Sequence, residues 1–311
     1  MSAPQAIVTG GAGFIGSHLV DALLADGYGV TVIDDLSSGD ARRVADAARL
    51  LELDIVDRAR VAAVIEEVGP ETVFHLAAQS SVVVSVENPG RDCEVNVQGT
   101  LNVVDTANKQ NIPVVFTSTG GALYGDEAPR PTNEQQIPKP LSPYGASKLA
   151  GESYLGTWSR AEGVANAICR LGNVYGPRQS PHGEAGVVSI FTHRLHTGQA
   201  PKLFGHGKPT RDYVYVADVV SALRAAAGKA GTFNIATGVE TDVMTIWSEL
   251  SKVAGSEVQP ELADLRPGEL QHSQLDASLA ESELGWRPEV PIAEGLRKTY
   301  EALVQEFNAA E

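Results

Sequence analysis

Short apolar runs alternate with longer segments of helical spacing through the first half of the chain. The runs are Ile7–Thr9, Val30–Asp34, Thr72–Ala77, Val114–Ser118 and Val164–Leu171. Continuous apolar strands that alternate with helices are typical of a parallel sheet covered by helices on both faces. The pattern therefore predicts an α/β fold of the Rossmann type, with a doubly wound parallel sheet.

Two long helices are expected in this half. One covers about Asn88–Gln110. The other begins at Ser142, a favourable N-cap residue that is followed by a proline at the first helical position, and runs towards Gly163.

The alternation of strands and helices becomes irregular after about Arg170, where glycine and proline become frequent and the predicted strands become short. Helical patterns recur at Val187–His196, Ala217–Ala227, Thr245–Ala254 and Pro291–Glu306. A regular half followed by mixed short elements indicates a smaller second domain on the C-terminal edge of the sheet. We expect domains at residues 1–170 and 171–311, with some exchange of strands or helices between them.

The composition argues against nucleic acids and membranes as binding partners. The 24 Lys and Arg residues against 39 Asp and Glu residues give a net charge of −15, which repels nucleic acids and anionic lipids. No run of about 18 apolar residues could span a bilayer, and no signal-peptide pattern opens the chain. Two cysteines, Cys93 and Cys169, form no disulfide framework and favour a reducing compartment. We expect a soluble cytoplasmic protein with no nucleic-acid or membrane partner.

A glycine-rich loop, Thr9–Gly16, joins the first strand to the first helix. Gly10, Gly13 and Gly16 let the backbone turn tightly and approach a pyrophosphate, and the helix N-terminus supplies N–H groups. Asp34 ends the next strand, where a carboxylate accepts hydrogen bonds from an adenosine ribose and repels a 2′-phosphate. Glycine spacing alone would also suit an ordinary turn, but the strand before it and the helix after it favour an NAD site.

Tyr144 and Lys148 lie four residues apart, just inside the helix that starts at Ser142. This spacing places both side chains on one helix face. A lysine ammonium and a positive nicotinamide would lower the pKa of the tyrosine from about 10. Tyrosine–lysine pairs on a protein surface can have the same spacing. Because an NAD-binding motif precedes this pair in the sequence, we expect Tyr144 to act as the base of an active site.

The spacing Gly-x-x-Gly-x-x-Gly resembles the extended short-chain dehydrogenase/reductase superfamily, and further motifs resemble its bacterial UDP-glucose 4-epimerases (UDP-galactose 4-epimerases). The resemblance covers nearly the whole chain. The motifs of the first half are Thr9–His18, Asp34–Gly39, Asp54–Ile55, His75–Gln79, Asn96–Thr100, Ser118–Asp126 and Tyr144–Lys148. Those of the second half are Arg170–Arg178, Phe204–Gly207, Arg211–Val214, Arg266–Glu269 and Leu284–Pro288.

The resemblance implies roles for particular residues. The implied cofactor-binding residues are Gly10, Gly13, Phe14, Ile15, Gly16, Asp34, Asp35, Asp54, Ile55, Leu76, Ala77, Ala78, Gln79, Asn96, Ser118, Tyr144 and Lys148. The implied substrate-binding residues are Ser81, Thr119, Tyr144, Asn173, Val187, Val188, Phe204, Arg211, Tyr213, Arg266 and Glu269. Asp54 and Ile55 would contact adenine. Arg211 and Arg266 match two arginines that hold the UDP phosphates, a task suited to the bidentate guanidinium.

The activity that the resemblance implies is the interconversion of UDP-glucose and UDP-galactose through a 4-keto intermediate, with tightly bound NAD. Residues 1–170 would then bind NAD and residues 171–311 the nucleotide sugar. Tyr144, Lys148 and Thr119 would be catalytic. The family commonly forms homodimers through two long helices per subunit, which correspond to about Asn88–Gln110 and Ser142–Gly163.

The sequence departs from the family at one catalytic position. The family has Ser or Thr four residues before the tyrosine of its Tyr-Gly motif, and counting back from Tyr124 reaches Gly120. Thr119 or Ser118 is then the candidate for the missing hydroxyl. Nucleotide-sugar 4,6-dehydratases need an adjacent Asp-Glu pair at this position, where the chain has Gly120, Gly121 and Ala122.

Several alternatives stay open on the sequence. The enzyme could instead be a UDP-glucuronate or UDP-N-acetylglucosamine 4-epimerase, and a non-catalytic NAD-binding sensor is a remote possibility. No metal is expected, because His193 and His196 have no third ligand candidate nearby.

Overall fold

A computed structural model describes residues 3–181, 186–265 and 270–310. Seven parallel strands form the central sheet, in the order β10-β6-β5-β4-β1-β2-β3. The strands are β1 (Gln5–Thr9), β2 (Gly29–Asp34), β3 (Arg49–Glu52), β4 (Thr72–His75), β5 (Val114–Thr119), β6 (Ala167–Leu171) and β10 (Gly231–Ile235). The predicted parallel sheet of the Rossmann type is confirmed.

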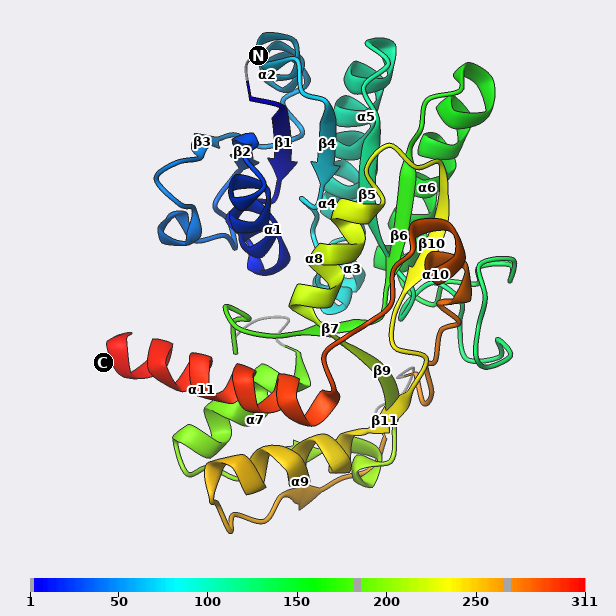
Figure 1. Cartoon of the computed structure of the whole chain (residues 1–311). Helices are drawn as coiled ribbons and strands as arrows, with labels where there is room; N and C mark the ends of the chain where they lie inside the picture. Colours follow the sequence, from blue (N-terminus) through cyan, green and yellow to red (C-terminus); the bar gives the residue numbers. More distant parts are fainter. Residues whose placement is uncertain (1–2, 182–185, 266–269, 311) are drawn as a thin grey trace.

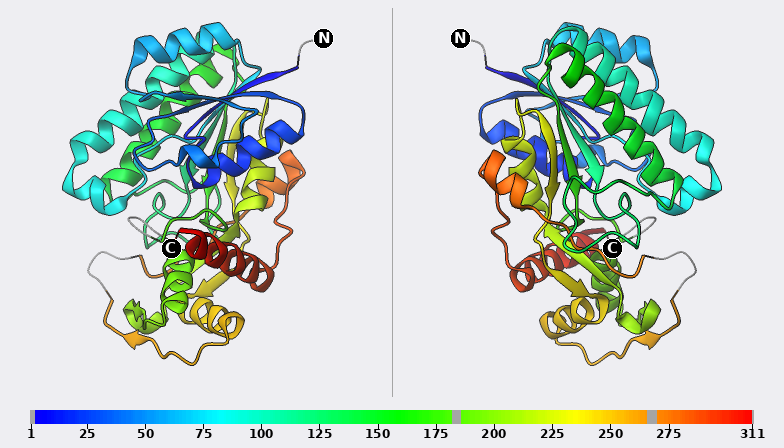
Figure 2. Two further views of the ribbon diagram at one scale, coloured as in Figure 1. Left: turned by 90° about the vertical axis from the view of Figure 1, so that its left-hand side faces the viewer. Right: turned by 90° about the vertical axis from the view of Figure 1, so that its right-hand side faces the viewer.

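Helices cover both faces of this sheet (Figures 1 and 2). One face packs against α1 (Phe14–Ala25) and α8 (Val216–Ala225), and the other against α2 (Arg58–Val68), α5 (Thr100–Lys109) and α6 (Pro143–Glu162). Successive strand residues point to opposite faces, so the neighbours Ile7 and Val8 lie in two different cores. This burial on both sides explains why the strands are apolar throughout.

The long helix predicted over about Asn88–Gln110 consists of three consecutive segments. After α3 (Val82–Glu87), a short helix α4 (Pro89–Cys93) leads into a π-helical segment, η2 (Glu94–Gly99), and then into α5. The long helix expected here is therefore present, with a π-helical centre. A π-helical turn changes the direction of side chains relative to an α-helix and is frequent at functional sites; here it contains the buried Asn96.

A smaller unit lies beyond the C-terminal ends of the central strands (Figure 1). Its three-stranded sheet has the order β11-β9-β7 and a two-stranded sheet pairs β12 with β8. The strands are β7 (Asn173–Tyr175), β8 (Lys202–Leu203), β9 (Thr210–Tyr215), β11 (Glu240–Asp242) and β12 (Glu261–Leu262). Helices α7 (Val187–His196), α9 (Val243–Ala254) and α11 (Ile292–Ala310) share a core with Tyr175 and Trp247. Three short helices complete the described elements: η1 (Ala41–Arg43), η3 (Phe204–Gly207) and α10 (Ser278–Leu284).

The chain crosses between the two units after residue 170. β10 pairs with β6 at the edge of the central sheet, and α8 packs on α1, whereas β7 and β9 belong to the smaller unit. The boundary at residue 170 stays a prediction. None of the helices in the described ranges has the length and apolarity needed to cross a membrane.

Candidate active site

The glycine loop lies at the C-terminal end of β1 and is packed against the neighbouring strand end. Gly10 has a φ of +72°, and a Cβ there would lie 2.7 Å from the backbone nitrogen of Ala77. A Cβ at Gly16 would overlap the carbonyl oxygen of Gly10. No side-chain hydrogen bond caps α1 from the part of the chain that is described, so the first-turn N–H groups are available to an anion. This cradle fits a pyrophosphate.

Asp34 fastens the loop to the segment after β2. Its Oδ2 accepts a hydrogen bond from the Ala12 backbone N–H (2.9 Å), and its Oδ1 accepts one from Leu36 (2.9 Å). Burial raises the pKa of the Asp34 carboxyl, and these two hydrogen bonds oppose the rise. A carboxylate oxygen can accept more than one hydrogen bond, so the predicted ribose contact is compatible with this geometry and stays a prediction.

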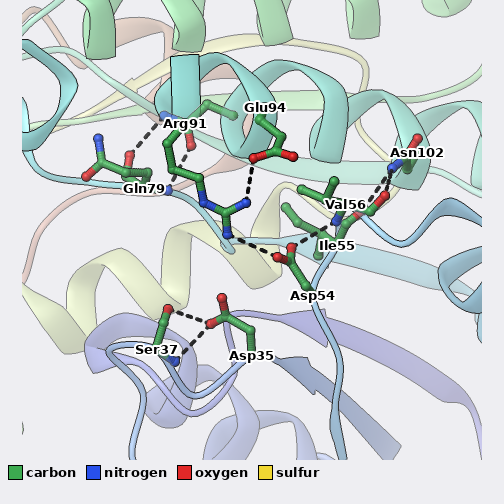
Figure 3. Close-up of polar contacts among 10 residues, drawn as sticks. Asp35, Ser37, Asp54, Ile55, Val56, Gln79, Arg91, Glu94 and Asn102 are labelled. Atoms are coloured by element: carbon green, nitrogen blue, oxygen red, sulfur yellow. Dashed lines mark hydrogen bonds and ion pairs between the residues drawn. The ribbon is translucent and has the colours of Figure 1, made fainter. Parts of the chain in front are cut away.

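Asp54, a predicted adenine contact, pairs with an arginine that the sequence analysis did not identify. Arg91 of α4 lies between Asp54 and Glu94 (Figure 3), and it donates to Asp54 Oδ2 (3.0 Å) and Glu94 Oε2 (2.8 Å). Ile55, next to Asp54, is buried. An arginine and a glutamate three residues apart in a helix are typical of an ordinary surface ion pair. The sequence therefore does not indicate the contact of Arg91 with Asp54. Asp35 lies across from this group and accepts hydrogen bonds from Ser37.

Lys148 is almost completely buried, with 4% of its surface exposed. Its Nζ donates to the carbonyl oxygen of Thr117 (3.0 Å) and lies 4.8 Å from the centre of the Phe116 ring. Burial lowers the pKa of Lys148 to about 8, while Asp92 and Glu152 oppose this shift. The ammonium is thus held at the end of β5, one helical turn beyond Tyr144.

Tyr144 has a raised pKa in the chain by itself. Burial raises it to about 12, and the negative charge of Asp92 adds to the rise, whereas a hydrogen bond with Thr119 lowers it. The sequence expectation concerned Lys148 together with a positive nicotinamide, so the lowered pKa stays a prediction for the NAD-bound enzyme. Removing the phenolate from water disfavours its charged form, and for that reason burial raises the pKa of the tyrosine.

Thr119 and Ser118, the two candidates for the hydroxyl that is absent at Gly120, have different surroundings. Thr119 shares a hydrogen bond with Tyr144 and accepts one from the Ala122 N–H (3.2 Å). Ser118 instead donates to Glu152 Oε1 (2.5 Å), and that carboxylate forms a buried ion pair with Arg170 (2.6 Å). Geometry therefore favours Thr119 as the hydroxyl beside the tyrosine.

The packing around Gly120, where the chain departs from the family, offers a reason for this glycine. A Cβ on Gly120 would overlap the buried side chain of Leu275. A serine or threonine at this position would require the Leu275 side chain to move, so the present packing favours glycine.

A hydrogen-bonded network surrounds Asn96 and joins the loop after β4 to α6. Asn96 Nδ2 donates to the carbonyl oxygen of Gln79 (2.9 Å), to Asp92 Oδ1 (3.1 Å) and to Ser147 Oγ (3.1 Å). Asn96 Oδ1 accepts from the Gln79 backbone N–H (2.9 Å). Ser81 is joined to the same loop through Gln79. Asp92 is a second residue that the sequence analysis missed, because one Asp in a helical segment carries no distinguishing pattern.

Three of the predicted substrate residues lie on strands of the smaller unit. Asn173 on β7 pairs in register with Tyr213 on β9, and Arg211 on β9 donates to the carbonyl oxygen of Thr210 (2.8 Å). Tyr213 is a core residue, 5% exposed, and Val188, at the start of α7, is 1% exposed.

The remaining predicted substrate residues lie in α7 and η3 or outside the described part. Val187 opens α7 and Phe204 opens η3, and both are half-buried. Arg266 and Glu269 lie outside the described residues. The roles of all these residues stay predictions.

Comparison with known proteins agrees with this geometry. Residues 6–236 match the model of the NAD dependent epimerase/dehydratase family. A UDP-glucose 4-epimerase of Mycolicibacterium smegmatis is 46% identical over 306 residues, which cover 96% of this chain and 97% of the relative.

Two solved structures have the same fold. The Thermotoga maritima UDP-glucose 4-epimerase with UDP-glucose has a TM-score of 0.95 and 43% identity, and covers 97% of this chain and 99% of its own. The Thermus thermophilus UDP-glucose 4-epimerase in complex with NAD has a TM-score of 0.89 and 41% identity, covering 96% and 98%. The chain therefore belongs to the NAD dependent epimerase/dehydratase family, in the group of the UDP-glucose 4-epimerases.

Proposed function

We propose that this protein is a UDP-hexose 4-epimerase that interconverts UDP-glucose and UDP-galactose with a tightly bound NAD. The observation that carries the proposal is the cluster of Tyr144, Thr119 and Lys148 at the strand ends beside the glycine loop. The similarity over nearly the whole chain to an enzyme solved with UDP-glucose supports this substrate.

Tyr144 is the proposed base, and it removes the proton from O4 of the sugar. Its hydrogen bond with Thr119 provides the second hydroxyl that can share this proton. NAD held by the glycine loop and Lys148 would supply the redox chemistry, uptake of hydride from C4 and its return to the opposite face. Because burial holds the pKa of Tyr144 at about 12 in the chain by itself, the phenolate needs the positive charges of Lys148 and of the nicotinamide.

The sugar turns between the two hydride transfers while the UDP part stays in place. Arg211 and Arg266 are the proposed phosphate ligands, and Asn173 contacts the diphosphate. In a protein of net charge −15, such local cations are needed to hold an anionic nucleotide.

We propose that the protein works in the cytoplasm as a homodimer. The two free cysteines support a reducing compartment such as the cytoplasm. Exposed apolar side chains on α3 and α6, among them Val83, Val86 and Tyr154, support an association surface at these helices.

Product analysis tests the proposed activity. The purified protein is incubated without added reductant with UDP-glucose, UDP-N-acetylglucosamine or UDP-glucuronate, and the products are separated by ion-pair chromatography. UDP-galactose from the first substrate is expected. Conversion of UDP-glucuronate alone would overturn the sugar assignment, and no conversion by protein that contains NAD would overturn the epimerase proposal.

Tyr144→Phe tests the base. The turnover number is expected to fall by about 10²- to 10⁴-fold, as is typical when a general base is removed, with the fold and bound NAD retained. Tyr154→Phe, on the exposed side of the same helix, is the matched control and should keep wild-type turnover.

Thr119 is tested by two substitutions. Thr119→Val keeps the shape but removes the hydroxyl, and we expect turnover to fall about 10- to 100-fold. Thr119→Ser should retain most of it. Equal activity of the Val and wild-type proteins would show that Thr119 takes no part in proton sharing.

A further inference from the structure

Asp92 is a buried carboxylate whose surroundings are unusual. It lies on α4 with 1% of its surface exposed. Its hydrogen-bond partners are two neutral amides, Gln79 Nε2 (2.9 Å) and Asn96 Nδ2 (3.1 Å). In residues 3–181, 186–265 and 270–310 no ion pair involves Asp92. Burying a carboxylate that makes no direct ion pair is costly, and the buried Lys148 is a cation that its charge acts on.

The first effect of Asp92 is to orient two amides. A carboxylate oxygen only accepts, so the NH₂ groups of Gln79 and Asn96 must point towards it. Their oxygens then point away, and they accept from the backbone N–H groups of Ser81 (2.6 Å) and Gln79 (2.9 Å). One carboxylate thus holds the loop Gln79–Ser81, which lies between the predicted cofactor and sugar contacts.

The second effect is electrostatic. The negative charge of Asp92 raises the pKa of both Tyr144 and Lys148. The other groups that face this pair act on one member each: Glu152 raises the pKa of Lys148, and Thr119 lowers the pKa of Tyr144 through its hydrogen bond. The pKa of His75 is lowered to about 3, so this imidazole is neutral near pH 7.

We propose that Asp92 is a positioning residue, which fixes the loop Gln79–Ser81 through the amides of Gln79 and Asn96 and, through Asn96 and Ser147, places a negative charge beside the Tyr144 and Lys148 face of α6. The advantage concerns Lys148: burial favours the loss of its proton, and a buried anion keeps the ammonium charged beside the cofactor. This inference rests on the proposed function for its kinetic consequences, but its electrostatic part can be measured without turnover.

The first experiment follows the ionisation of Tyr144 directly. Holoenzyme with ¹³Cζ-labelled tyrosine is titrated by NMR, and the Tyr144 resonance is identified by its loss in Tyr144→Phe. In Asp92→Asn, which removes the charge at nearly constant shape, the midpoint is expected to fall by about one pH unit. Asp105→Asn, a charge removal on α5 where the aspartate pairs with Arg58 and Lys109, is the control and should leave the midpoint unchanged. An equal midpoint in Asp92→Asn and wild type would overturn the inference.

Kinetics provide the second readout and separate the two proposals. In Asp92→Asn both limbs of the kcat–pH profile are expected to move to lower pH, because both pKa values fall. A wild-type protein that epimerises no UDP-sugar, together with a shifted Tyr144 midpoint, would refute the proposed function and leave the role of Asp92 standing. If the wild type and Asp92→Asn are both active and the limbs of their kcat–pH profiles coincide, the role proposed for Asp92 is refuted and the proposed function is not.

A second pair of variants covers the case in which Asp92→Asn does not fold. Asp92→Glu keeps the charge but displaces it, and Gln79→Leu keeps Asp92 but releases the loop. Both should keep the pH limbs of the wild type and raise KM for the UDP-sugar about 3- to 10-fold. Unchanged KM in both variants, or limbs that move in Gln79→Leu, would overturn the inference.

Discussion

His75 shows how a buried polar residue sets the shape of the cofactor site. Thr9 Oγ1 accepts from the backbone N–H groups of Leu76 and Ala77 (3.2 Å each), so its own proton goes to His75 Nδ1 (2.7 Å). The proton of the imidazole is then on Nε2, which donates to Thr100 Oγ1 (3.0 Å). This chain of hydrogen bonds holds the loop against Gly10, and it requires a neutral imidazole.

We predict a pH dependence of stability from His75. Burial lowers its pKa from 6.5 to about 3, so the unfolded state binds a proton that the folded state does not. This contribution is fully present above about pH 6.5 and is lost as the pH falls towards 3, by about 1.4 kcal/mol per pH unit. Urea unfolding at pH 7, 6, 5 and 4 should show a shallower loss in His75→Gln. His206→Asn, at an exposed histidine, should follow the wild type.

At the scale of elements, α6 is joined to the sheet by a buried ion pair. Glu152 accepts from Arg170 on β6 and from Ser118 on β5, and Arg170 also donates to Tyr124 (2.7 Å). Both members of the pair are about nine-tenths buried or more. The tie fixes α6, and with it Tyr144 and Lys148, relative to the strand ends.

Glu152→Gln is predicted to destabilise the protein strongly. It leaves the guanidinium of Arg170 buried without its anion, which costs about 3–5 kcal/mol. Chemical denaturation measures the loss. Glu249→Gln, which breaks an exposed pair with Lys252, should change stability by less than about 1 kcal/mol. Similar losses in both variants would contradict the proposed tie.

The ion pair of Arg91 and Asp54 joins α4 to the segment after β3 (Figure 3). Both side chains are between one third and two fifths exposed, so the pair is worth up to about 1 kcal/mol. We predict that Arg91→Met releases NAD up to about fivefold faster, measured by cofactor loss on gel filtration at low salt. Arg49→Met, which breaks the exposed pair with Glu67, should retain NAD as the wild type does.

At the scale of the whole molecule, the exposed apolar residues are expected to pair two copies. Val83 and Val86 on α3 are 54% and 62% exposed, and Tyr154 on α6 is 40% exposed. We predict a particle of about twice the chain mass of 32.8 kDa in sedimentation experiments. Val86→Asp should shift the equilibrium to monomer. Val253→Asp, at an exposed valine of α9, should not, and a wild-type monomer would refute the dimer.

The sequence determined the parts that depend on local pattern. Runs of buried aliphatic residues indicated the parallel strands, the Ser-Pro start gave the N-terminus of α6, and the predicted α7 has the observed bounds Val187–His196. The glycine loop and the spacing of Tyr144 and Lys148 can likewise be recognised from the sequence. The chemistry at these sites depends on residues within one or two helical turns of each other.

Only the tertiary structure decided what depends on residues far apart in the chain. The choice between Thr119 and Ser118 follows from which one meets Tyr144 and which one meets Glu152. The raised pKa of Tyr144 and the contact of Arg91 with Asp54 likewise arise between elements that the sequence separates. Burial and electrostatic contacts are set by packing in space, and for that reason periodicity and spacing along the chain do not reveal them.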